Sequence, residues 1–124
     1  MKKKIFIVDD DDFFSTMMED HLSKNVLIET SKFPTGELCL ANLHEKPYAV
    51  VLDYNLDSQI KGAANGLTIL KQIKKLVPET HVILLSSQSK YGVAATTISE
   101  GADHYIIKDN DAFKAIDSIF SDLL

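Results

Sequence analysis

The stretch Ala49-Val50-Val51-Leu52-Asp53 decides the fold, because four consecutive apolar residues end abruptly at an acid. An unbroken apolar run of this kind is typical of a strand buried on both faces, as strands are in a parallel sheet covered by helices. Two further runs repeat the pattern: Ile5-Phe6-Ile7-Val8 ends at Asp9-Asp10, and Val82-Ile83-Leu84-Leu85 ends at Ser86-Ser87. The sequence therefore predicts an α/β domain in which several strand ends carry polar side chains.

Helical segments separate the predicted strands. We predict strands over 5–8, 26–28, 49–52, 82–85 and 104–107, and helices over 13–22, 37–43, 66–76, 91–100 and from an N-cap within 109–111 to about 123. The first and third helices are expected to gather apolar side chains on one face, namely Phe14, Met17, Met18 and Leu22, and Leu67, Leu70, Ile73 and Leu76 or Val77. This alternation predicts a doubly wound parallel sheet in the order 2-1-3-4-5, with the weak second strand outermost.

Composition limits the classes of protein to which the chain can belong. Its 124 residues, 45% hydrophobic and 25% charged, suit one globular domain over residues 1–124. The net charge of −5 argues against direct binding of nucleic acid or of anionic membranes, and no apolar stretch is long enough for a membrane span or a signal peptide. The single cysteine, Cys39, cannot form an intramolecular disulfide, and we expect a buried structural thiol in a cytoplasmic protein.

Polar side chains follow four of the five predicted strands. Because ligands bind beyond the carboxyl ends of the strands in an open parallel sheet, Asp9, Asp10, Asp53, Ser86 and Lys108 are expected to converge at one edge. Three close carboxylates repel one another, and a divalent cation is the simplest compensation. Oxygen ligands favour Mg²⁺, with Mn²⁺ as an alternative, and the four histidines show no metal-ligand spacing.

A carboxylate cluster beside an amine and a hydroxyl indicates phosphoryl transfer. A cation and the Lys108 ammonium would neutralise the phosphoryl oxygens, and Ser86 would donate a hydrogen bond to one of them. A carboxylate can itself be the nucleophile, which gives an acyl phosphate. One strand-terminal acid alone is most often a turn or cap residue, the interpretation we adopt for Asp11 and Asp12, so the prediction depends on the whole set. The sequence contains no glycine-rich phosphate loop.

These residues resemble the receiver domain of two-component response regulators, in the correct order and over essentially the whole chain. The matching stretches are 5–10, 50–56, 82–87 and 101–108. The resemblance implies a flavodoxin-like fold and a switch that takes a phosphoryl group from a sensor histidine kinase or a histidine phosphotransfer protein. Small donors such as acetyl phosphate would serve as well. A downstream protein target or an output domain would read the switch through the fourth helix, fifth strand and fifth helix.

The resemblance also gives each matching residue a role. Asp53 is the expected phosphoacceptor, and the expected Mg²⁺ ligands are Asp9, Asp10, Asp53 and the backbone carbonyl of Asn55. Ser86 and Lys108 would act on the phosphoryl group, while Ser86 and Tyr105 would move as the switch. Two positions are expected to set the lifetime of the phosphorylated state, Asn55 and Gln88. The chain would catalyse only its own phosphorylation and dephosphorylation.

Two departures from the family pattern stand out. Asp109 occupies the place where the family usually has a proline after a cis peptide bond, so we expect either a trans bond or local strain there. The loop over 56–65 is about five residues longer than is usual after the phosphoacceptor, and we hypothesise that it overhangs the site and tunes donor access or partner choice.

Two other functions compete with this interpretation. A phosphatase of the haloacid dehalogenase type also uses an aspartyl phosphate, and Asp9 with Asp11 would imitate its Asp-x-Asp pair. Such an enzyme would carry its phosphoryl group on Asp9, whereas a receiver would carry it on Asp53. The other competitor is a receiver-like interaction module that is never phosphorylated, which a failure to bind Mg²⁺ would favour.

Overall fold

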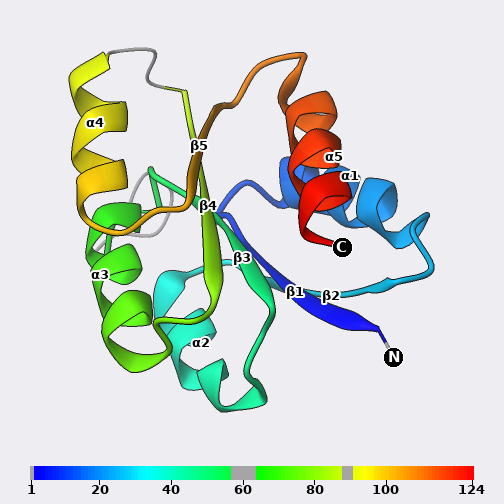
Figure 1. The fold of residues 1–124 in the computed structure, drawn as a ribbon, viewed down its shortest axis with the longest axis horizontal. Coiled ribbons are helices and arrows are strands. Elements are labelled where there is room, and N and C mark those ends of the chain that lie inside the picture. The colour runs from blue at the N-terminus through cyan, green and yellow to red at the C-terminus, as the bar shows by residue number, and fades with distance from the viewer. Residues whose placement is uncertain (1, 57–63, 88–90) are drawn as a thin grey trace.

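A parallel sheet with helices on both faces forms the domain, and the computed structural model describes residues 2–56, 64–87 and 91–124 of it (Figure 1). The strands are β1 (Lys3–Val8), β2 (Ile28–Phe33), β3 (Ala49–Asp53), β4 (His81–Ser86) and β5 (His104–Ile107). The helices are α1 (Asp12–Ser23), α2 (Gly36–Ala41), α3 (Gly66–Leu76), α4 (Tyr91–Ser99) and α5 (Ala112–Leu123), with a short 3₁₀ turn, η1 (Leu43–Glu45), after α2.

The strand order is β2-β1-β3-β4-β5 and every neighbouring pair is parallel, which confirms the predicted topology. Figure 1 shows α1 and α5 on one face of the sheet and α2, α3 and α4 on the other. Val8 of β1 pairs with Leu52 of β3, and Leu85 of β4 pairs with Asp53. This register brings the carboxyl ends of the three central strands to the same edge of the sheet.

Every residue in the apolar runs of β1, β3 and β4 is apolar because both faces of these central strands are buried. Alternate residues of these strands join the core under α1 and α5, namely Ile5, Ile7, Ala49, Val51, Ile83 and Leu85. The intervening residues join the core under α2 and α3, namely Phe6, Val8, Val50, Leu52, Val82 and Leu84. A strand exposed on one face would have shown a polar residue at every second position, so the parallel sheet follows from the runs themselves.

The second strand begins later than we predicted. Val26 and Leu27 are 78% and 49% exposed and lie before β2. They belong to a turn built on Asn25, whose side-chain oxygen accepts from Leu27 N at 2.9 Å and whose backbone oxygen accepts from Ile28 N at 3.1 Å. β2 lies at the edge of the sheet and is only partly buried beyond its first residue, so its own pattern gave a weak signal.

Of the side chains predicted to share a helix face, Met17 is exposed, and of the alternatives Leu76 and Val77 it is Leu76 that is exposed. Met17 is 43% exposed and Leu76 is 62% exposed, whereas Met18 and Ile73 on the same helices are fully buried. Leu76 is the last residue of α3, and Val77, the alternative we named, packs against the core in its place. The second helix also ends two residues early, at Ala41, and the predicted end residue belongs to η1.

Helix ends follow the capping chemistry of the sequence. The Asp11 carboxylate accepts from Phe14 N at 3.1 Å and starts α1, as expected of a cap residue. Gly101 has φ +113° after α4, which confirms it as the end of that helix. Asp111 precedes α5 without a side-chain capping bond.

Cys39 is buried, and burial raises the pKa of its thiol to about 12. No described helix has the length and apolarity needed to cross a membrane.

Candidate functional site

Three acids meet at the carboxyl ends of β1 and β3. Asp9 and Asp53 are each 3% exposed, and Asp10 is partly buried beside them. One carboxylate oxygen from each of the three lies within 4.8 Å of the other two. The pairing of β1 with β3 produces this cluster, because both strands end in an acid at the same level of the sheet. The predicted convergence of the three carboxylates is confirmed.

Lys108 extends over the same acids from the end of β5. Its Nζ lies 2.8 Å from Asp9 Oδ2 and 3.8 Å from Asp53 Oδ2, and its side chain is only 17% exposed. The backbone of Lys108 is held by β4, because Lys108 N donates to Ser86 O at 2.8 Å. The peptide bond from Lys108 to Asp109 is trans, so of the two expectations for this position, a trans bond or local strain, the first is confirmed.

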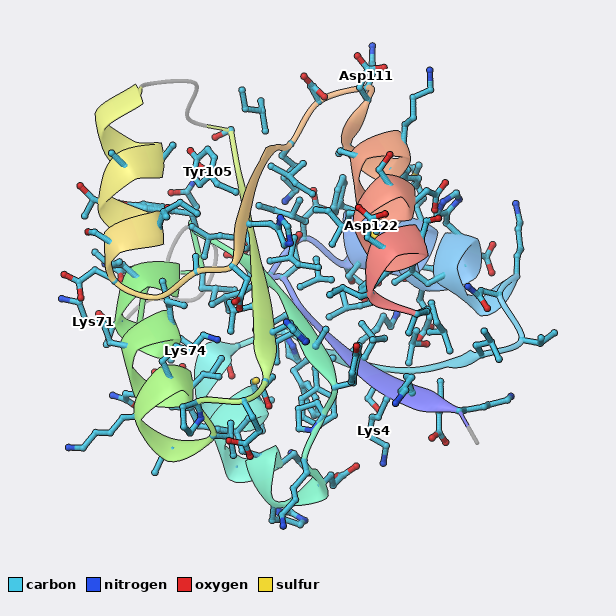
Figure 2. The ribbon with its side chains drawn as sticks, in the orientation of Figure 1. Lys4, Lys71, Lys74, Tyr105, Asp111 and Asp122 are labelled. Atoms are coloured by element: carbon cyan, nitrogen blue, oxygen red, sulfur yellow. The ribbon has the colours of Figure 1, made fainter. Side chains whose placement is uncertain are left out.

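Ser86 and Tyr105 lie on the two strands that follow β3 in the sheet, Ser86 on β4 and Tyr105 on β5. Ser86 is fully buried at the last position of β4, one residue beyond the partner of Asp53 in the sheet. Tyr105 is partly buried and packs against the core under α2 and α3. Figure 2 shows Tyr105 on β5, on the side of the sheet where α4 lies. The hydroxyl of Ser86 thus lies on the strand next to that of Asp53, and Tyr105 lies on the following strand.

Electrostatics make the ionised form of Asp53 costly. Burial raises the pKa of Asp53 to about 7, and the nearby Asp9 carboxylate contributes to the rise. The Lys108 ammonium and the hydrogen bond from Asn55 N, at 3.3 Å from Asp53 Oδ1, act in the opposite direction. A second positive charge at this point would lower the pKa of Asp53 and relieve the repulsion between the acids.

The residues present fit a hard divalent cation. Asp9 Oδ1 accepts from Asp11 N at 2.9 Å, whereas Asp9 Oδ2 is buried and accepts no hydrogen bond from the part of the chain that the structure describes, although the Lys108 ammonium approaches it. A buried carboxylate oxygen without a hydrogen bond, next to two further carboxylates, is a donor set that suits Mg²⁺ or Mn²⁺.

Two features of the site were not predicted from the sequence. Gly66 begins α3 against the backbone at the end of β3, where a Cβ would lie 2.4 Å from Asp53 O and 2.7 Å from Tyr54 Cα. Phe14 places its ring under Lys108, with 4.5 Å between Nζ and the ring centroid. Asn65 before Gly66 is an N-cap residue, which indicates that a helix begins at Gly66. Nothing in the local sequence linked Phe14 to Lys108.

Asn55 lies beside the cluster, and its Nδ2 is 3.4 Å from Ser87 Oγ. This contact joins the segment after β3 to the segment after β4. Gln88, the other residue expected to set the lifetime, lies outside the described residues, as does most of the long loop over 56–65.

Comparisons with known proteins agree with this geometry. The protein-family model of the response regulator receiver domain matches residues 5–120 of this chain. The chain is 27% identical over 120 residues to the chemotaxis protein CheY of Bacillus subtilis, with 96% of both proteins covered. It is 32% identical over 112 residues to the DNA-binding transcriptional regulator NtrC of Salmonella typhimurium, with 90% of this chain and 23% of that protein covered. The BeF3-activated receiver domain of DrrB, a Thermotoga maritima protein, has a TM-score of 0.85 at 31% identity, with 99% of this chain and 98% of that chain covered.

Proposed function

Since this chain belongs to the response regulator receiver domains, which are phosphoacceptor switches of two-component signalling and not classical enzymes, we propose that Asp53 accepts the phosphoryl group. The observation that carries this proposal is the pairing of a buried, strand-terminal Asp53 with two acids and one ammonium at a single point. Asp53 is the acid at the end of the central strand, between the two acids that follow β1 and the hydroxyl at the end of β4.

Receiver domains bind Mg²⁺ through acidic residues, and in this chain Asp9, Asp10, Asp53 and the backbone carbonyl of Asn55 would hold it. When bound, the cation supplies positive charge to the phosphoryl oxygens and to the acid cluster. Two features support this assignment: the buried Asp9 Oδ2 accepts no hydrogen bond among the described residues, although the Lys108 ammonium is 2.8 Å away, and the pKa of Asp53 is raised. A cation shared by the carboxylates would give that oxygen a ligand bond and lower that pKa. Mn²⁺ would serve in the same way.

In the proposed reaction an oxygen of the Asp53 carboxylate attacks the phosphorus of a phosphohistidine on a kinase or phosphotransfer protein. The new O–P bond forms as the P–N bond breaks, and the imidazole nitrogen keeps the electron pair and takes up a proton. Lys108 stabilises the transferred charge, since its ammonium is already 3.8 Å from Asp53. Ser86 donates its hydroxyl hydrogen to a phosphoryl oxygen. Small acyl phosphates would react similarly, with the carboxylate leaving in place of imidazole.

The signal would leave the site through Ser86 and Tyr105. A phosphoryl group adds negative charge and three acceptor oxygens next to the end of β4, which favours a shift of Ser86 toward it. Tyr105 would then turn further into the space beside α4 and change the surface formed by α4, β5 and α5, where a downstream protein or an output domain would bind. Hydrolysis of the acyl phosphate resets the switch, and Asn55 would influence its rate because it lies between Asp53 and Ser87.

The test is incubation with acetyl phosphate and Mg²⁺, followed by measurement of intact mass. Wild type should gain the mass of one phosphoryl group, and the gain should vanish in Asp53→Asn and when a chelator removes Mg²⁺. Asp122→Asn, which changes an exposed acid of α5, is the matched control and should still gain the phosphoryl group. Equal labelling of wild type and Asp53→Asn would refute the assignment of the acceptor.

A further inference from the structure

Two acids and one aromatic ring lie close to the ammonium of Lys108 among the described residues. Nζ lies 2.8 Å from Asp9 Oδ2, 3.8 Å from Asp53 Oδ2 and 4.5 Å from the centre of the Phe14 ring. The ring belongs to α1, on a different element from either acid. We propose that Phe14 is a positioning residue, whose aromatic face holds the Lys108 ammonium between Asp9 and Asp53, ready for the phosphoryl group. This inference rests on the proposed function of Lys108.

A lysine needs such a support because its charge sits at the end of a flexible four-carbon chain. The backbone of Lys108 is fixed by its hydrogen bond to β4, but that bond leaves the direction of the side chain open. The two acids attract the ammonium without determining how it is shared between them. An aromatic face attracts a cation over a broad area, so it can hold the ammonium while allowing a small movement from Asp9 to a group on Asp53.

Phe14 is itself well anchored for this task. Its backbone N–H donates to the Asp11 carboxylate at 3.1 Å, which fixes it in the first turn of α1. Its ring lies 5.6 Å from the ring of Phe113 on α5, and the Phe113 ring lies 5.0 Å from that of His21. His21 Nε2 is 2.7 Å from Asp117 Oδ1. A row of aromatic rings across α1 and α5 thus supports the one ring that touches the ammonium.

The Phe14 ring packs against the edge of the core under α1 and α5, but core packing alone does not require its contact with the Lys108 ammonium. The residue is only partly buried and lines an open groove of about 510 Å³ between α1 and the start of α5, together with Met17, Phe113 and the stem of Lys108. A side chain selected for burial alone would lie deeper, as Met18 does on the same helix. The position of the ring at the border between the groove and the ammonium is what its proposed role requires.

The test compares Phe14→Leu with Phe113→Leu, a matched change of the neighbouring ring that does not touch the ammonium. The measured quantities are the rate of phosphorylation by acetyl phosphate and the affinity for beryllofluoride, a phosphoryl analogue. Loss of a cation–π contact of this kind should lower both by about three- to tenfold in Phe14→Leu. Phe14→Tyr, which keeps the aromatic face, should restore them. Phe113→Leu keeps an apolar side chain against the Phe14 ring and leaves that ring beside the ammonium, so it should stay within about twofold of wild type. Equal effects of the two leucine variants would overturn the proposal.

A double-mutant cycle with Lys108→Ala separates positioning from general structure. If Phe14 acts through the ammonium, Phe14→Leu should have no further effect on either quantity once Lys108 is removed. A purely structural role would reduce both values again by the same factor, and that result would also overturn the proposal.

An NMR measurement keeps the inference separate from the proposed function. In wild type without any phosphodonor, the Lys108 ε-methylene protons should resonate upfield of those of the other lysines, because the ammonium bonded to that methylene lies 4.5 Å from the centre of the Phe14 ring. The shift should disappear in Phe14→Leu and persist in Phe113→Leu. If the chain takes no phosphoryl group, the proposed function fails while this upfield shift still supports the positioning contact. A Lys108 resonance among the other lysines in wild type refutes the contact itself.

Discussion

Replacing Asp53 with Asn should stabilise the Mg²⁺-free protein at neutral and alkaline pH. Asp53 is 3% exposed, and burial first and the Asp9 carboxylate second raise its pKa from 3.8 to about 7. The folded protein therefore keeps a proton on Asp53 that the unfolded chain has released between about pH 4 and pH 7. Stability contributed by this group falls as the pH rises through that window and stays low above it.

The pKa difference sets the size of the effect. An increase of about three pKa units, at about 1.4 kcal/mol each, amounts to about 4 kcal/mol, which is an upper limit because neighbours rearrange in the variant. Asn has nearly the shape of Asp and carries no charge. We expect Asp53→Asn to be more stable than wild type by about 2–4 kcal/mol near pH 8, and by less than about 1 kcal/mol near pH 4.

Urea denaturation in the presence of a chelator, at both pH values, measures this difference. Asp122→Asn removes an exposed acid of α5 and should change the free energy of unfolding little at either pH. Adding Mg²⁺ should stabilise wild type near pH 8 and should stabilise Asp53→Asn much less. A variant that is no more stable than wild type at the higher pH, or a gain that is the same at both, would refute the reasoning.

Three further predictions concern Lys108 and Gly66 beside Asp53, and the ion pair of Asp103 with Lys74. Lys108→Met should raise the pKa of Asp53 further and move Mg²⁺ binding, followed by calorimetry, to higher pH, since Lys108 lowers that pKa; an unchanged pH dependence would contradict the ion pair. Gly66→Ala should cost about 1–3 kcal/mol in urea denaturation and weaken Mg²⁺ binding, because its Cβ would meet Asp53 O; a neutral effect would contradict the close approach. Burial acts to raise the pKa of Asp103, but the Lys74 ammonium helps to lower it below its usual value. Asp103→Asn should therefore lower the free energy of unfolding by about 1 kcal/mol at pH 7. This loss should shrink at acid pH, where Asp103 is protonated in wild type. A loss that does not change with pH would contradict that ion pair.

The sequence was most informative where physical constraints are local and strict. The central strands are buried on both faces, and the resulting apolar runs predicted the strand order and the convergence of Asp9, Asp10, Asp53 and Lys108. Gly101 was predictable because a left-handed backbone after a helix favours glycine. These features depend on each residue's own conformation or on its position relative to one strand end.

The parts that were missed depend on contacts between distant segments. β2 lies at the edge of the sheet, and the exposed Val26 before it carried more apolar character than much of the strand. Phe14 could be assigned to a helix face but not to Lys108, because the two residues are far apart in the sequence and meet only in the folded chain. Gly66 shows the same limit, since its need for glycine arises from the backbone of β3.

The identity of the phosphorylated residue tests the central claim most directly. After reaction with acetyl phosphate and Mg²⁺, borohydride reduction converts an aspartyl phosphate to homoserine, and peptide mass mapping locates the changed residue. A receiver switch predicts homoserine at position 53 and unchanged acids at positions 9 and 10. Homoserine at position 9 would contradict the account in favour of a phosphatase of the haloacid dehalogenase type, and no modified acid at all would leave a receiver fold without the proposed switch.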